Sequence, residues 1–211
     1  ELAQPRFVGG SYTVGNDGQS GVTGNAVQIY GGGTGSIPIM FENSEFFSTD
    51  RGCRNQDNGR SAVWIEESFA EFKDITVVSG DFGLSFRSSA GKVSGSTINV
   101  NCNGVDINGM ISVGANEYAA NVSGNNITTV EGTPITAYAG ALAEIHGNTL
   151  SGAAGGSGIG VQSSRVTIHG NTIGPIGGWN GIWLYGSFDV DAQNNTITDT
   201  AKEPVMAGDY W

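Results

Sequence analysis

Apolar residues occupy every second position in many short segments of this chain. Segment 62–65 carries Val63 and Ile65, and segment 83–86 carries Leu84 and Phe86. An apolar period of two is typical of a β-strand with one buried face. Further pairs of this kind are Val105/Ile107, Ile159/Val161 and Ile182/Leu184. Because no segment shows a sustained apolar stripe with the helical period, we predict an all-β chain.

The alternating segments belong to an internal repeat. The tetrads GNNI (124–127), GNTL (147–150), GNTI (170–173) and NNTI (194–197) follow one another in steps of 23, 23 and 24 residues. Upstream, GIGV (158–161) and GIWL (181–184) are also 23 residues apart. The repeat predicts seven units, with a partial eighth at Pro204, whose starts lie near Ile39, Ala62, Gly83, Gly104, Thr133, Gly158 and Gly181.

Units of this length are too small to bury an apolar face alone, so each must stack on its neighbours. Equivalent strands then lie above one another, about 4.8 Å apart, and the favoured crossover is right-handed. The pattern therefore predicts a right-handed parallel β-helix, a solenoid of about seven to eight turns, here called rungs. We expect opening strands or a cap in 1–38, rungs in 39–203, and an end strand or the start of a continuation in 204–211. The stretch GMISVGANEY (109–118) is expected to bulge out as a longer loop.

One asparagine recurs at the same position of each tetrad. Asparagine tolerates left-handed backbone conformations at tight turns, and stacked amides can hydrogen-bond from rung to rung. We therefore expect a structural ladder formed by Asn125, Asn148, Asn171 and Asn195.

Two histidines follow inward isoleucines in successive units. His146 and His169 should point outward and stack on adjacent rungs. Two histidines alone are a weak basis for a metal site, so we expect none there.

Composition and charge narrow the classes of partner. The 211 residues include 35 Gly, and only 14% are charged, which fits strands and turns rather than disorder. With 20 acidic and 9 basic residues the net charge is −11, which disfavours nucleic acid as a partner. Because no run of 18 apolar residues occurs, we expect no membrane insertion.

The two cysteines, Cys53 and Cys102, lack the spacing of metal ligands. Cys53 lies in the polar loop STDRGCRNQDNGRS, which is long enough to reach a partner. One disulfide and two separate thiols both remain open at this point.

The unit VTIHGNTI (166–173), read as V-x-I-x-G-N-T-I, resembles the repeats of the right-handed parallel β-helix, or pectin-lyase-like, superfamily. The resemblance covers roughly residues 39–200, and FVGGSYTV (7–14) is similar to the strand that opens many such helices. It implies a fold shared by polysaccharide lyases, glycoside hydrolases, sugar epimerases, phage tailspikes, adhesins and non-catalytic surface proteins. The chain lacks the Asp-Pro-His-Asp signature of mannuronate epimerases and the clustered Asp pair of polygalacturonases. The resemblance therefore carries over no catalytic residue.

Alternation also predicts which residues point outward from the first strand of each unit. One outward column contains Trp64, Ser85, Asp106, Thr136, Gly160 and Trp183. The next contains Glu66, Arg87, Asn108, Tyr138, Gln162 and Tyr185. In sugar-acting members of the superfamily such a face commonly binds the polymer.

Aromatic residues on this face are candidates for contact with a ligand or a partner, because they can stack on sugar rings. Packing beneath a loop is the alternative. The candidates are Trp64, Tyr138, Trp179, Trp183 and Tyr185.

The same face carries charged residues from three successive rungs, namely Glu66, Arg87 and Asp106. Glu66 and Asp106 should have backbones roughly 9–10 Å apart at the rung spacing. This is near the upper end of the carboxyl separation in inverting glycosidases, about 6.5–9.5 Å. These three residues are therefore the catalytic candidates, and a solvated acidic face with an arginine counter-charge is the alternative.

No cofactor is expected, apart from a weak calcium candidate at Asp189 and Asp191. We expect strand alternation to place both acidic side chains on one outward face. The Gly-Gly-x-Gly-x-Asp repeat of calcium-binding β-rolls is absent.

Together these features favour an extracellular or surface-exposed structural or binding protein. It could assemble as a fibre, sheath, adhesin or tail component, and could contact polysaccharide along its outward face. The alternative is a polysaccharide lyase or glycoside hydrolase that uses the Glu66/Arg87/Asp106 face. The expected partners are polysaccharide or identical subunits, and the sequence leaves open the choice between binding and assembly.

Overall fold

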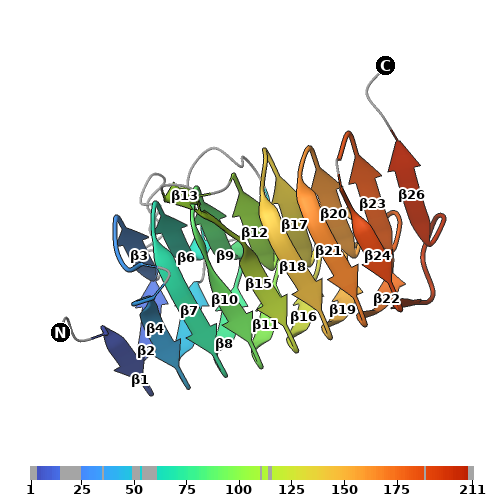
Figure 1. Cartoon of the computed structure of the whole chain (residues 1–211). Helices are drawn as coiled ribbons and strands as arrows, with labels where there is room; N and C mark the ends of the chain where they lie inside the picture. Colours follow the sequence, from blue (N-terminus) through green and yellow to red (C-terminus); the bar gives the residue numbers. More distant parts are fainter. Residues whose placement is uncertain are drawn as a thin grey trace.

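The computed structural model describes residues 4–14, 25–34, 36–48, 53, 61–109, 111–113, 116–187 and 189–208. In these residues the chain forms strands and no helix, as the alternating pattern predicts. The strands stack along one axis, with the N-terminus near one end and the C-terminus near the other (Figure 1). No helix in the described ranges has the length and apolar character needed to cross a membrane.

Most strands belong to three eight-stranded sheets, each with parallel pairing throughout. Sheet A contains β1 (Arg6–Val8), β4 (Ile39–Glu42), β7 (Phe69–Lys73), β10 (Ala90–Ser94), β15 (Ala120–Ser123), β18 (Leu142–His146), β21 (Arg165–His169) and β24 (Asp191–Gln193). Sheet B contains β2 (Ser11–Val14), β5 (Glu45–Ser48), β8 (Thr76–Ser79), β11 (Thr97–Val100), β16 (Asn126–Thr129), β19 (Thr149–Gly152), β22 (Thr172–Ile176) and β25 (Thr196–Ile197). Sheet C contains β3 (Val27–Tyr30), β6 (Ser61–Glu66), β9 (Phe82–Arg87), β12 (Val105–Asn108), β17 (Ile135–Tyr138), β20 (Ile159–Gln162), β23 (Ile182–Tyr185) and β26 (Val205–Gly208).

Three consecutive strands, one from each sheet, make one rung. The chain therefore completes eight rungs, and each strand pairs with its equivalent in the next rung. The predicted parallel β-helix is confirmed.

The first predicted unit start is wrong. Ile39 opens β4 in sheet A and lies opposite Ala70. The position opposite Val63 in sheet C is occupied by Val27, so residues before 39 already contribute a full rung. This first rung lacks the Gly-Asn-Thr-Ile signature, and the long segment between β5 and β6 interrupts the spacing on which the prediction depended.

The expected loop in 109–118 contains a short antiparallel hairpin. β13 (Ile111–Val113) pairs with β14 (Asn116–Tyr118), outside the three main sheets. The two strands of the insertion therefore pair with each other and not with the rungs.

The core lies between the three sheets and is made by the inward residues that alternation predicts. At the N-terminal end it is aromatic, with the rings of Phe41 and Phe72 stacked at 5.3 Å between centroids. Phe86 meets Phe72 edge-on at 6.2 Å. Towards the C-terminal end the core is aliphatic, and residues such as Ile145 and Ile168 are completely buried.

The amide ladder runs through four rungs at the turn between sheets A and B. Asn125 Nδ2 donates to Asn148 Oδ1, Asn148 Nδ2 to Asn171 Oδ1, and Asn171 Nδ2 to Asn195 Oδ1, each at 2.9 Å. The Nδ2 of each of the four side chains also donates to a backbone carbonyl, as that of Asn148 does to Val122 O at 2.8 Å. Buried turn groups are satisfied in this way along the axis.

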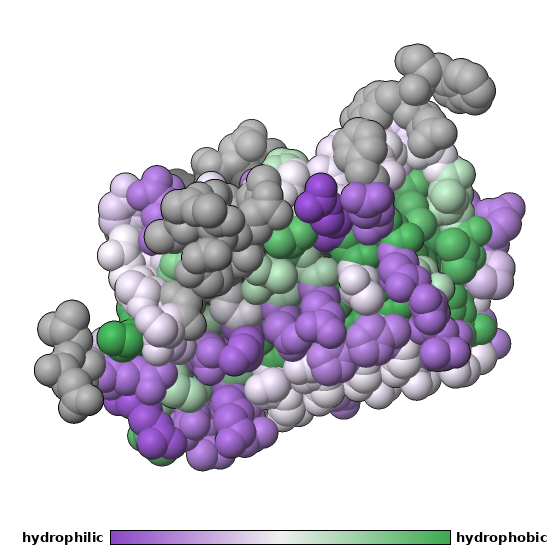
Figure 2. Space-filling view, in the orientation of Figure 1, coloured by the Kyte–Doolittle hydropathy of each residue, from purple (hydrophilic) through white to green (hydrophobic). Residues whose placement is uncertain are grey.

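The outer face of sheet A carries the histidine pair. His146 and His169 stack with their ring centroids 4.9 Å apart and an interplanar angle of 1°, as predicted. Figure 2 shows this side of the molecule with hydrophilic residues over most of the face and hydrophobic residues gathered towards the end that carries β23 and β26.

Candidate functional site

The two outward columns on sheet C are in the predicted register. Trp64 lies opposite Ser85, Ser85 opposite Asp106, and Asp106 opposite Thr136. The column continues through Gly160 to Trp183. In the second column Glu66, Arg87, Asn108, Tyr138, Gln162 and Tyr185 are stacked in the same order.

A hollow of about 330 Å³ lies over the middle of this face. Its lining includes Asp106, Thr136 and Gly160 from the first column and Tyr138 and Gln162 from the second. Since these positions come from successive rungs, the hollow is built by stacking and not by one local motif.

The hollow exists partly because Gly160 has no side chain. The neighbours in its column are Thr136 on one side and the bulky Trp183 on the other. A Cβ placed on Gly160 would lie 3.7–3.9 Å from Thr133, Thr136 and Trp183, which is ordinary van der Waals contact. A small side chain would fit here, and a large one would occupy the hollow.

Two charged groups meet at one side of the hollow. Arg87 Nη2 lies 3.0 Å from Asp106 Oδ2, and the Asp106 side chain is only 2% exposed. The hydroxyl of Tyr138 donates to Asp106 Oδ2 at 3.0 Å, while Arg87 Nη1 donates to the Tyr138 oxygen at 2.6 Å. Thr136 donates to the other carboxylate oxygen, and Asn103 Nδ2 lies 3.4 Å from it. The carboxylate is thus surrounded by donors.

Burial, and then the negative charge of Asp106, raise the pKa of Tyr138 to about 12. Both effects disfavour the phenolate, because a second negative charge would form beside a buried carboxylate. Tyr138 is therefore protonated at neutral pH and acts as a hydrogen-bond donor.

The Arg87 guanidinium lies over two aromatic rings. The Trp64 ring centroid lies 5.1 Å from the guanidinium carbon and the Tyr138 centroid 5.7 Å from it. Trp64 Nε1 in turn donates to Glu66 Oε2 at 2.9 Å. Of the three catalytic candidates, the structure brings Arg87 and Asp106 together, whereas Glu66 is held by Trp64 and does not line the hollow.

The opposite side of the hollow is aromatic. Trp183 and Trp179 meet edge-to-face at 6.5 Å, and Tyr185 stacks on Trp183 at 5.4 Å. Trp179 is 45% exposed, and Lys202 Nζ lies 4.7 Å from its ring centroid. Of the five aromatic candidates, Tyr138, Trp179 and Trp183 line the hollow, whereas Trp64 and Tyr185 support it from outside.

Sequence reasoning missed several lining residues that lie at turns. Asn103 precedes β12, and its Oδ1 accepts a hydrogen bond from the Thr133 backbone N–H at 3.0 Å. Ser157, before β20, also lines the hollow. Turn side chains do not follow the period of two, so alternation could not have found them.

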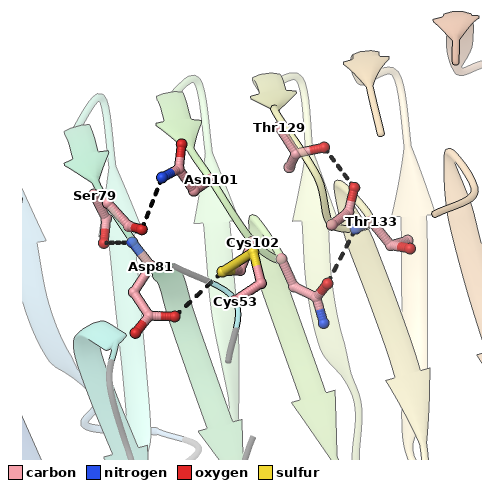
Figure 3. Close-up of a disulfide and its surroundings, with 10 residues drawn as sticks. Cys53, Ser79, Asp81, Asn101, Cys102, Thr129 and Thr133 are labelled. Atoms are coloured by element: carbon pink, nitrogen blue, oxygen red, sulfur yellow. Dashed lines mark hydrogen bonds between the residues drawn. A yellow bond between two sulfur atoms is a disulfide. The ribbon is translucent and has the colours of Figure 1, made fainter. Parts of the chain in front are cut away.

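Cys53 and Cys102 form a disulfide with a Cα–Cα distance of 5.3 Å, which resolves the alternative left open by the sequence. Figure 3 shows the bridge where two turns of successive rungs stack. Asp81 lies on one turn and Asn101 on the next, and Asn101 Nδ2 donates to Gly80 O at 3.0 Å. Because Cys102 directly precedes Asn103, the disulfide anchors the turn that forms one wall of the hollow.

The calcium candidate is not assembled. Asp189 lies before β24, in a left-handed conformation with φ of 51°, so strand alternation does not place it on one face with Asp191. Asp189 Oδ2 lies 3.4 Å from Arg165 Nε, and Asp191 accepts hydrogen bonds from Gln193. In the part of the chain that the structure describes, no group of three His, Cys, Asp or Glu side chains could hold a metal ion.

Comparison with known proteins supports the fold. Residues 109–209 match a family model described as a right handed beta helix region. The comparisons with curated proteins and with solved structures gave no match. This match and the parallel pairing within all three eight-stranded sheets show that the chain has the fold of a right-handed parallel β-helix.

Proposed function

We propose that this protein is a glycan-binding β-helix that holds a saccharide in the hollow over sheet C. The observation that carries the proposal is the pairing of an aromatic wall, Trp179 and Trp183, with a polar wall that contains Asp106 and Tyr138. A volume of about 330 Å³ lies within the range of small-molecule sites, about 300–1,000 Å³.

A saccharide suits these two walls because its ring has both apolar C–H faces and polar hydroxyls. The indole of a tryptophan offers a large apolar surface on which the C–H face of the sugar can lie. The backbone and side-chain groups of Asn103, Thr133 and Ser157 supply hydrogen-bond partners for the sugar hydroxyls. The rigid stacking of rungs holds both walls in place before the ligand arrives, which lowers the entropic cost of binding.

The proposal includes an extracellular location. The Cys53–Cys102 disulfide supports it, because disulfides form and persist in oxidising compartments such as the cell exterior.

The arrangement favours binding over glycoside hydrolysis. Most glycosidases use two carboxyl groups on either side of the scissile bond, and the described lining of the hollow contains one, Asp106. The carboxylate oxygens of Asp106 accept hydrogen bonds from Tyr138 and Thr136, and Asp106 also forms an ion pair with Arg87. Tyr138, with its pKa near 12, is a poor base for a lyase reaction at neutral pH.

The test is a set of variants screened against an array of neutral and acidic oligosaccharides. Trp183→Ala should weaken binding of the best ligand at least tenfold, because aromatic anchors dominate binding energy. Gly160→Leu should abolish binding by filling the hollow, whereas Gly160→Ala should retain it, since its Cβ makes ordinary contacts. Tyr30→Ala, at an exposed aromatic on the distant strand β3, is the matched control and should change nothing.

Circular dichroism and thermal melting would establish that each variant folds. The proposal fails if no oligosaccharide binds the wild-type protein, or if folded Gly160→Leu binds as tightly as wild type.

Assembly with identical subunits is a second candidate, favoured by the exposed apolar side chains on the first and last strands. These are Phe7 and Val8 on β1 and Val205 and Met206 on β26. Sheet edges pair readily with further strands. Sedimentation velocity across a hundredfold concentration range should show growing species, and Val205→Asp should suppress them. A single monomeric species at every concentration would exclude this candidate.

A further inference from the structure

We propose that the hollow over sheet C selects uncharged saccharides and rejects uronates. This inference rests on the proposed function and specifies its ligand class. It depends on how the two charged groups of the hollow, Arg87 and Asp106, satisfy each other.

The charge of Arg87 is already balanced inside the protein by Asp106. Its Nη2 pairs with Asp106 at 3.0 Å and its Nη1 donates to Tyr138 at 2.6 Å. The remaining nitrogen, Nε, is buried. The guanidinium carbon also lies 5.1 Å from the ring centroid of Trp64 and 5.7 Å from that of Tyr138. Arg87 and Asp106 therefore form an ion pair that brings no net positive charge to the hollow.

Arg87 is the only cationic residue in the described lining of the hollow. A bound uronate would therefore exchange its hydration for a lining whose one cation is already paired with the carboxylate of Asp106. Burying an unpaired charge is costly. The net charge of −11 adds a long-range repulsion against any polyanion.

A neutral sugar meets none of these penalties. Its hydroxyls can exchange hydrogen bonds with neutral groups such as the Thr133 and Ser157 side chains, and its C–H face can lie on the tryptophans. The same walls that exclude a carboxylate therefore accept the uncharged ring.

The experiment compares oligosaccharides that differ only in the oxidation of C6. Hexaoses of β-1,4-linked glucose, β-1,4-linked mannose and α-1,4-linked galactose are each paired with the corresponding hexauronate. Isothermal titration calorimetry should show at least tenfold tighter binding of the neutral member in every pair that binds. Equal or tighter binding of a hexauronate would overturn this inference and leave the proposed function intact. If no member of any pair binds, both proposals fail.

A charge introduced into the hollow should change this selectivity. Gln162 lines the hollow, and Gln162→Lys places a cation there; we expect the ratio of uronate to neutral affinity to rise at least tenfold. Thr167→Lys, at an exposed position of β21 on sheet A, makes the same change in net charge on a different face of the solenoid. It should leave the ratio within about twofold of wild type. Equal shifts in the two variants would show that net charge, and not the neutrality of the hollow, sets the selectivity, and would overturn the inference.

Discussion

Arg87 Nη2 lies 3.0 Å from Asp106 Oδ2, on adjacent strands of sheet C, with side chains that are 19% and 2% exposed. Lys92 and Glu71 make an ion pair of the same length, 3.0 Å, on the outside of sheet A, with side chains that are 61% and 23% exposed. The two ion pairs have the same N–O distance but differ in burial. A difference between their contributions to stability therefore reports the effect of burial.

We expect Arg87→Met to lower the free energy of unfolding by about 3–5 kcal/mol, because it leaves the Asp106 charge buried without its cation. Lys92→Met should cost about 0–1 kcal/mol, since water screens the exposed pair. Urea denaturation at neutral pH measures both changes.

The double variant Arg87→Met/Asp106→Asn should recover part of the lost stability, because no unpaired charge remains. A similar small cost for Arg87→Met and Lys92→Met would show that burial of the sheet C pair has no energetic consequence.

We expect the loss of an asparagine at the centre of the amide ladder to lower the free energy of unfolding. Asn148 Oδ1 accepts hydrogen bonds from both the backbone N–H and the side chain of Asn125, and Asn148 Nδ2 donates to Val122 O. Asn148→Ala leaves these buried groups without partners, and should lower the free energy of unfolding by about 1–3 kcal/mol for each group that water cannot reach. Asn99→Ala, at an exposed position of sheet B, is the control and should stay within about 0.5 kcal/mol of wild type. Equal midpoints in denaturant for the two variants would exclude a stabilising role for the ladder.

The raised pKa of Tyr138 predicts that the free energy of unfolding decreases at alkaline pH. Its pKa is about 12 in the folded protein, against 10.0 for an unperturbed tyrosine. Because the folded state holds this proton more tightly, the associated stability is present below about pH 10 and is lost as the pH rises through about 12. The difference in tyrosinate absorbance between wild type and Tyr138→Phe should therefore titrate near pH 12. A midpoint near 10 would mean that Asp106 and burial do not act on this hydroxyl.

The disulfide joins residues 49 positions apart. Closing a loop of this size restricts the unfolded chain, and its reduction should lower the free energy of unfolding by about 2–4 kcal/mol. Denaturation curves with and without a thiol reductant measure the change. The double variant Cys53→Ser/Cys102→Ser should resemble the reduced protein and should not respond to the reductant. A response of the double variant would assign the effect to something other than this bond.

Strand positions were predictable because the side-chain period of a strand is a local property. The register of Trp64, Asp106 and Trp183 in one column follows directly from that period and the repeat spacing. The same reasoning placed Ile39 wrongly, because the first rung carries no signature and a long insertion follows it. The predicted unit starts were therefore correct where successive repeats are similar in sequence. The prediction failed where an irregular segment changes the spacing between units.

The candidate site was predictable in part. Alternation placed Arg87, Asp106 and Tyr138 on one face, but it did not show that they bond to one another. Those bonds depend on side-chain conformations across three rungs. The contribution of Asn103 was not visible either, because it comes from a turn whose direction is set by tertiary contacts.

The sequence by itself determined the all-β class, the stacking of rungs and the inward or outward direction of strand residues, since each follows from a short-range period repeated along the chain. The tertiary structure alone decided that Gly160 opens a hollow, that Arg87 and Asp106 neutralise each other, and that Cys53 is bonded to Cys102. The physical reason is distance along the chain. Periodicity depends on neighbouring residues, whereas cavities, ion pairs and disulfides depend on groups that meet only after the rungs have stacked.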